Sequence, residues 1–169
     1  MPITINGTSG ISGVDGSSGT PAIQGTDTNT GIFYPAADTV AIATSGTEQL
    51  RVDSSGNLRF NSGYGSVVTS YGCRAWVNFN GTGTVAIRAS GNVSSITDLN
   101  TGKYQVNFST SMPDANYSAV AMMRADTDYA PTIGQPHEYS AQSSSSFSLK
   151  TGSSTAAIDS SIVTVAVFR

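Results

Sequence analysis

The chain has 169 residues and a formal net charge of −3, and 11% of its residues are charged, against roughly 25% in a typical globular protein. Its eight Lys and Arg residues are too few for the basic surface that phosphate binding requires, which argues against a nucleic-acid partner. A single cysteine and a single histidine exclude an internal disulfide framework and a histidine-rich metal site. Val, Ile and Thr outnumber Leu, Met, Glu, Gln and Lys, which predicts β structure rather than a helical bundle or a doubly wound α/β enzyme.

The sequence also lacks the usual signals for export or membrane insertion. Its start, MPITINGTSG, has neither a basic region nor an apolar stretch of signal-peptide length. No segment approaches the ~20 apolar residues of a transmembrane helix. We therefore expect no membrane insertion.

Residues 1–26 carry glycine at every third position. Five glycines hold this register: Gly7, Gly10, Gly13, Gly16 and Gly19. In a collagen-like triple helix every third residue faces the common axis, where only glycine fits. The register therefore predicts a thin three-chain stalk or attachment segment with these glycines on the axis. A flexible Gly/Ser-rich linker and a glycine-rich turn region are the alternatives.

Residues 27–66 contain three short segments in which apolar and polar residues alternate. The apolar pairs are Val40 and Ile42, Leu50 and Val52, and Leu58 and Phe60; the residues Gln49, Arg51, Asn57 and Arg59 take the opposite face. Turn sequences at 45–47 and 53–56 connect the segments, so we expect a three-stranded meander with one apolar face. A sheet this small needs a partner layer. The simplest partner is the same face of two further copies, which predicts a three-sided β shaft.

The string TDTNTGIFYPAADTVAIATSGTEQLRVDSSGNL resembles a unit that recurs in tail-fibre and other fibrous virion proteins of bacteriophages. The shared elements lie at 27–35, 43–48 and 51–57. The resemblance covers about thirty residues. It implies a structural role in the virion and a trimer, and it does not indicate which part of the virion carries the protein.

Residues 67–169 are expected to form a β-sandwich or jelly-roll head, because short alternating segments and turn sequences follow one another closely. Trp76 is predicted to lie in the core, beside Val77 and Phe79. The predicted strands are Arg74–Asn80, Thr84–Ser90, Val93–Asp98, Lys103–Phe108, Tyr117–Arg124, Ser146–Lys150 and Ser161–Phe168.

The head also carries two resemblances of its own. The string from RAWVNFNGTG to YSAVAM is similar to a C-terminal module of phage fibre proteins. The segment YQVNFSTSMPDANYSAVAM, followed by FSLKT and IVTVAVFR, is similar to H-type lectin domains, which are six-stranded trimeric sandwiches. This second resemblance implies a β-sandwich fold. No ligand-binding residue of the lectins can be matched to a residue of this sequence.

Residues with catalytic or metal-binding potential are few. A Ser-His-Asp site would depend on His137 alone, and Asp126 and Asp128 suit a solvated loop better than the carboxylate pair of a glycosidase. Nothing in the spacing of Asp126, Asp128, His137 and Glu138 follows a known metal-ligand pattern. Cys73 is a lone thiol. We predict no enzymatic activity, no metal and no cofactor.

The segment between Arg124 and Ser146 is the longest interruption in the head and gathers aromatic, acidic and proline residues. Long loops on a rigid scaffold commonly carry recognition, and aromatic rings with nearby carboxylates suit sugar binding. A loop that packs at a subunit interface or covers the sandwich is the alternative. The candidate receptor-binding residues are Asp126, Asp128, Tyr129, His137, Glu138 and Tyr139.

The sequence thus predicts an all-β chain with three parts: a collagen-like or extended glycine-repeat segment (1–26), a short trimeric β-meander shaft (27–66) and an antiparallel β-sandwich head (67–169). The expected function is that of a homotrimeric fibre or spike of a bacteriophage virion, made in the host bacterial cytoplasm. Its N-terminal segment would bind other virion proteins, and its head would bind host cell-surface glycan. The alternative is a trimeric capsid decoration or cement protein, or a head fibre, that stabilises the shell.

Overall fold

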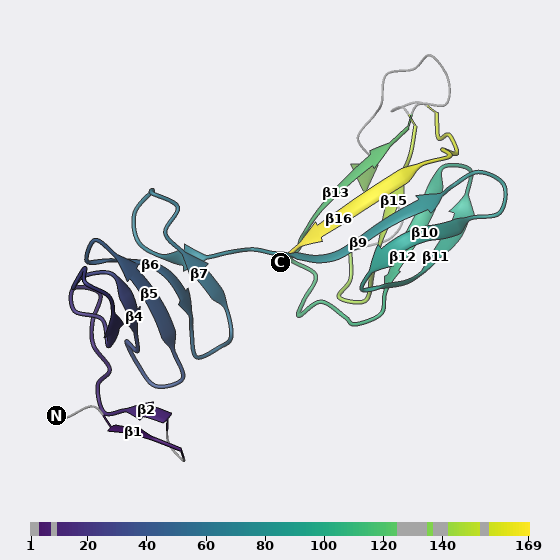
Figure 1. Cartoon of the computed structure of the whole chain (residues 1–169). Helices are drawn as coiled ribbons and strands as arrows, with labels where there is room; N and C mark the ends of the chain where they lie inside the picture. The colour runs from purple at the N-terminus through teal and green to yellow at the C-terminus, as the bar shows by residue number, and fades with distance from the viewer. Residues whose placement is uncertain (1–3, 8–9, 125–134, 137–141, 153–155) are drawn as a thin grey trace. The chain divides into compact units, whose positions relative to one another are not determined.

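The computed structural model describes residues 4–7, 10–124, 135–136, 142–152 and 156–169 (Figure 1). These residues form β-strands, turns and irregular segments with no α-helix, as the composition predicts, and so include no helix that could cross a membrane. The chain divides into two compact units, Met1–Ser70 and Tyr71–Arg169.

The glycine-rich start of the first unit forms a short hairpin followed by a turn. Strand β1 (Thr4–Asn6) pairs antiparallel with β2 (Gly10–Ser12), and an isolated bridge joins Gly16 to Pro21. Gly13 and Gly16 have φ angles of 112° and 70°, whereas every residue of a collagen chain holds φ near −75°. In the single chain this segment is therefore not collagen-like, and its association in threes stays a prediction.

The rest of the first unit is one antiparallel sheet whose strands follow one another in chain order. The strands predicted around Val40, Leu50 and Leu58 are present as β5, β6 and β7, and the sheet extends beyond them on both sides. Its strands are β3 (Ile23–Gln24), β4 (Gly31–Phe33), β5 (Val40–Thr44), β6 (Thr47–Val52), β7 (Leu58–Phe60) and β8 (Val68–Thr69). The predicted three-stranded meander is thus the centre of a six-stranded sheet.

The second unit contains two four-stranded antiparallel sheets, and each of the seven predicted strands of the head is present. One sheet has the order β10-β9-β16-β13 and the other β11-β12-β15-β14. The strands are β9 (Cys73–Asn80), β10 (Ala86–Gly91), β11 (Val93–Asn100), β12 (Lys103–Phe108), β13 (Ser118–Met123), β14 (Gln135–Pro136), β15 (Ser146–Lys150) and β16 (Val163–Phe168).

Both sheets of the second unit contribute to one hydrophobic core, which makes the unit a β-sandwich. Val77 and Phe79 of one sheet are buried in the same cluster as Tyr104, Val106 and Leu149 of the other. The rings of Phe79 and Tyr104 meet edge to face, with centroids 5.1 Å apart, a favourable arrangement for aromatic pairs. The alternation predicted for these strands is therefore confirmed.

The prediction that Trp76 lies in the core is wrong. Successive side chains of a strand point to opposite faces, so the burial of Val77 directs its neighbour Trp76 outward. Trp76 is 45% exposed.

Candidate functional site

The six candidate receptor-binding residues all lie outside the described part of the chain. They are Asp126, Asp128, Tyr129, His137, Glu138 and Tyr139. Their role in recognition stays a prediction. The structure instead directs attention to the first unit, where the two faces of the six-stranded sheet differ sharply in chemistry.

One face of this sheet carries an unbroken row of apolar side chains. Residues that pair directly across neighbouring strands lie on the same face, and such pairs connect all six strands from β3 to β8. The row consists of Ile23, Ile32, Ile42, Leu50, Phe60 and Val68. A second row, beside the first on the same face, consists of Val40, Val52 and Leu58.

We call these nine residues the apolar face. In the single chain most of them are open to solvent: seven have exposed fractions between 38% and 46%. Neither row includes a charged or polar residue. A continuous exposed apolar surface of this kind is typical of an interaction site.

The opposite face of the sheet is closed by its own chain. Phe33, Ala41 and Ala43 form a small buried cluster there. Backbone hydrogen bonds fasten the neighbouring loops to the sheet: the Tyr34 amide donates to the Asp15 carbonyl at 2.8 Å, and the Gly46 amide to the Asn29 carbonyl at 2.8 Å. The sheet therefore has one covered side and one uncovered side.

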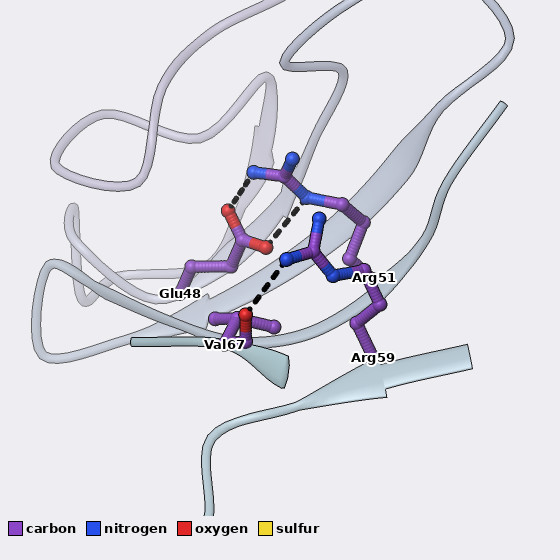
Figure 2. A network of polar contacts seen from close by, with 4 residues as sticks. All are labelled: Glu48, Arg51, Arg59 and Val67. Carbon is purple, nitrogen blue, oxygen red and sulfur yellow. Dashed lines mark hydrogen bonds and ion pairs between the residues drawn. The ribbon is translucent and has the colours of Figure 1, made fainter. Parts of the chain in front are cut away.

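An ion-pair network also lies on the covered side (Figure 2). Arg51 donates from Nε to Oε1 of Glu48 at 2.6 Å, and its Nη2 donates to Oε2 of the same carboxylate. Arg59 is the direct cross-strand partner of Arg51, and its Nη2 donates to the Val67 carbonyl at 2.9 Å. The hydrogen bond with Glu48 raises the pKa of Arg51 above its ordinary value, so the Arg51 guanidinium stays charged.

The network has two guanidinium groups and one carboxylate, and Nε of Arg59 is buried without a hydrogen-bond partner. Two like charges on directly opposed strand residues destabilise a sheet, and the Glu48 carboxylate offsets that repulsion. Together with Ser66 and Val67, the three charged residues line a cleft of about 260 Å³. The arrangement fixes the strands β6 and β7 and the segment before β8 to one another.

Several residues of the fibre-like motif have structural roles in the turns. The Asp53 carboxylate accepts hydrogen bonds from the amides of Ser55 and Asn57, each at 3.0 Å. Both hydrogen bonds lower the pKa of Asp53 below its ordinary value, and the bond from the Asn57 amide has the larger effect. In the preceding loop, the Asp27 carboxylate accepts a hydrogen bond from the Thr30 hydroxyl at 2.7 Å. These residues of the motif thus determine turn geometry.

Gly31 has no room for a side chain. A Cβ atom at this position would lie 2.0 Å from the carbonyl oxygen of Ile23. Because Gly31 is the Cα partner of both Gln24 and Ala43, this close approach occurs where β3 joins the sheet. The glycine of the motif is therefore required for the sheet to reach its full width.

A buried polar network lies around Tyr104 in the head. The Tyr104 hydroxyl lies 2.8 Å from the Gly81 carbonyl oxygen and 2.9 Å from Oδ1 of Asp159. The same carboxylate oxygen accepts a hydrogen bond from the Gly102 amide at 2.6 Å. Burial, and then the neighbouring Asp159, raise the pKa of Tyr104 far above its ordinary value. The phenol stays protonated. Together with the Asp159 carboxylate it links the loops that carry Gly81, Gly102 and Asp159.

A second cleft, of about 420 Å³, lies in the first unit beside the apolar face, and Val40 and Val52 of that face form part of its wall. Its lining residues are Asp15, Tyr34, Ala36, Asp38, Thr39, Val40 and Val52. Within the described ranges, no three His, Cys, Asp or Glu side chains gather as they would around a metal ion.

Sequence reasoning found six of the nine apolar-face residues and missed Ile23, Ile32 and Val68. These three belong to strands of two or three residues, too short for a period of two to be visible. The cross-strand register, rather than local periodicity, shows that they extend the row.

No protein-family model, curated protein or solved structure matches the chain.

Proposed function

We propose that the chain is a structural fibre or spike protein of a bacteriophage virion, and that it assembles as a homotrimer through the apolar face of its first unit. The observation that carries the proposal is the uncovered row of apolar side chains across all six strands. The motif resemblance and the three-residue glycine register support three copies, and thus a three-sided shaft.

The energetics favour association through this face. Burial of apolar surface contributes about 25 cal/mol per Å², and seven of these side chains retain 38% to 46% exposure in the single chain. In a three-sided prism each apolar face meets the faces of two other copies, so all three are covered at once. The ion pair of Glu48 with Arg51 and the loops around Asp15 lie on the other face, which therefore points outward.

The proposed roles of the ends follow from this shaft. The N-terminal segment attaches the trimer to other virion proteins, and the head binds host cell-surface glycan through the loop that carries Tyr129, His137 and Tyr139. Three identical heads would combine weak glycan contacts through avidity.

Sedimentation equilibrium of the full chain tests the assembly. We expect a trimer for the wild type. Ile42→Lys places a charge in the centre of the apolar face, and we expect the dissociation constant to rise at least about a hundredfold. Ser55→Lys adds the same charge at an exposed turn position and serves as the matched control, with an unchanged mass. A monomeric wild type at all concentrations would refute the proposal.

A separate experiment tests attachment. Fluorescently labelled trimer is incubated with host cells and with purified envelope glycans, beside a variant with Tyr129, His137 and Tyr139 changed to Ala. Loss of binding in the variant alone supports the loop as the recognition site, whereas no binding by the wild type removes the receptor role. Antibody labelling of intact particles then places the protein on the tail or on the shell, where it would act as a decoration protein.

A further inference from the structure

We propose that the cleft lined by Glu48, Arg51, Arg59, Ser66 and Val67 is a binding site for a small oxyanion, that is, for a carboxylate, sulfate or phosphate group, and that the Arg59 guanidinium is the main group that holds it. This inference goes beyond the proposed fibre function. It does not depend on the trimer, because the two arginines lie on the side of the six-stranded sheet opposite the apolar face.

The register of the sheet brings the charged side chains of the cleft to one face. Arg51 of β6 is the direct partner of Ala41 in β5 and of Arg59 in β7, so both arginines share the face of Ala41. Glu48 precedes Arg51 by three residues, a spacing that puts two side chains on opposite faces of a regular strand. A bulge in the pairing of β5 with β6 returns Glu48 to the face of Arg51. The backbone thus holds two guanidinium groups and one carboxylate together.

The cleft has one positive charge in excess. The Glu48 carboxylate is engaged by Arg51, whose Nε and Nη2 both donate to it. Within the described part of the chain, Arg59 forms no ion pair; the Asp53 carboxylate accepts its hydrogen bonds within its own turn. A bound anion would neutralise the excess charge and offset the repulsion between two arginines on directly opposed residues.

Arg59 also has hydrogen-bond donors that lack acceptors. A guanidinium has five N–H donors, and the described contacts of Arg59 use one of them, from Nη2 to the Val67 carbonyl oxygen at 2.9 Å. Its Nε is buried without a partner, which is costly for a polar group. Figure 2 shows the Arg59 guanidinium beside the paired Glu48 and Arg51, with a single hydrogen bond of its own. The oxygens of an anion would supply the missing acceptors.

The size and the chemistry of the cleft suit an oxyanion. Its volume is about 260 Å³, whereas a water molecule takes about 30 Å³ of the liquid, so an ion of a few non-hydrogen atoms fits. The planar guanidinium matches the oxygens of carboxylates and phosphates, and Ser66 adds a hydroxyl to the lining. The larger cleft of the first unit has the opposite charge, since it is lined by Asp15 and Asp38 and by no Lys or Arg. An anion would therefore bind beside Arg59.

Titration calorimetry of the full chain tests the site. Sodium acetate, sulfate and phosphate are compared with sodium chloride at the same ionic strength, and we expect saturable binding of at least one oxyanion and none of chloride. Acetate stands for a carboxylate, and the other two for tetrahedral groups. Arg59→Gln should raise the dissociation constant at least about tenfold, as for the loss of one charged hydrogen bond. Arg74→Gln makes the same change at an exposed position of the head and should match the wild type.

Two further variants keep the test valid should Arg59→Gln fail to fold. Glu48→Gln removes the only carboxylate of the cleft lining and should lower the dissociation constant at least about threefold, because the excess positive charge grows. Arg59→Lys keeps the charge but has no Nε–H donor, so its affinity should fall below that of the wild type. Unchanged affinity in both variants would contradict the site.

The Nε–H signals of arginine in a ¹⁵N–¹H NMR spectrum locate the anion. The signal that disappears in Arg59→Lys is that of Arg59. We expect it to shift on titration with the oxyanion that binds best in calorimetry, while the signal of Arg74 stays in place. An Arg59 signal that does not move while the wild type binds the anion would place the anion elsewhere and overturn the inference.

The remaining outcomes separate this inference from the proposed trimer. No saturable binding of any of the three oxyanions by the wild type, or equal binding by the wild type and Arg59→Gln, would overturn the anion site. Sedimentation of the same samples reports the assembly independently. A trimer without binding that depends on Arg59 refutes the anion site alone, and a monomer with such binding refutes the trimer alone.

Discussion

The hydroxyl of Tyr104 lies 2.9 Å from Oδ1 of Asp159, a residue 55 positions away in the sequence, and so ties β12 to the segment before β16. We predict that Tyr104→Phe destabilises the head by about 1–3 kcal/mol, because the buried Gly81 carbonyl loses its donor and the Asp159 carboxylate loses one of its donors. Urea denaturation followed by circular dichroism measures the effect. Tyr64→Phe removes the hydroxyl of a side chain that is 91% exposed and should leave stability unchanged.

Alkaline pH should destabilise the head through its buried tyrosines. Burial raises the pKa of Tyr117 from 10.0 to about 12, and that of Tyr104 is raised further. Between the unfolded and folded pKa values the unfolded chain loses a proton that the folded chain keeps. The contribution of these tyrosines to the free energy of unfolding is therefore fully present below pH 10. Above pH 10 it falls by up to about 1.4 kcal/mol per pH unit for each tyrosine.

Denaturation midpoints measured from pH 8 to pH 12 check this prediction, and absorbance titration should show two tyrosines that ionise later than the others. In Tyr104→Phe one late ionisation should disappear. A midpoint that does not change above pH 10 would contradict the assignment.

Gly31 of β4, beside the edge strand β3 of the first unit's six-stranded sheet, allows a direct test of close packing. Gly31→Ala should destabilise the first unit by about 1–3 kcal/mol, because its Cβ atom would lie 2.0 Å from the carbonyl oxygen of Ile23. Gly25→Ala is the matched control, since no atom lies within 4 Å of its Cβ position. Thermal unfolding of both variants measures the difference, and equal midpoints would show that β3 does not depend on this contact.

The ion pair of Glu48 and Arg51 should contribute about 1–2 kcal/mol, because its two hydrogen bonds are charged and partly shielded from solvent. Glu48→Gln should destabilise the first unit, because it removes the carboxylate that offsets the repulsion between Arg51 and Arg59. Dissolved salt screens that repulsion, so the loss of stability should become smaller as the salt concentration rises. A double-mutant cycle with Arg51→Ala isolates the pair energy. A coupling near zero would mean that the network does not stabilise the sheet.

Much of the fold could be predicted because local alternation determines which residues face a core. Val163, Val165 and Val167 are buried together, and Val40 pairs with Val52 on the same face. The same rule should have placed Trp76 outward, because it is one residue from Val77. The position of Trp76 beside Val77 and Phe79 predicted its burial, but adjacent residues of a strand face opposite sides of the sheet.

Other features depend on pairing between distant residues and left no local signal. The contact of Tyr104 with Asp159 and the adjacency of Arg51 and Arg59 follow from register, which short-range periodicity does not show. The glycine register predicted extended chains, whereas the positive φ angles of Gly13 and Gly16 give a turn in the single chain. The six candidate recognition residues lie outside the described ranges, so their chemistry stays a prediction.

The six-stranded sheet of the first unit adds its strands in chain order, and each strand from β3 to β8 contributes one residue to the row that begins at Ile23 and ends at Val68. The row therefore grows by about 4.8 Å for each strand. Tandem duplication of a hairpin would lengthen it while leaving its width unchanged. The length of the apolar row therefore scales with the number of strands that the sequence encodes.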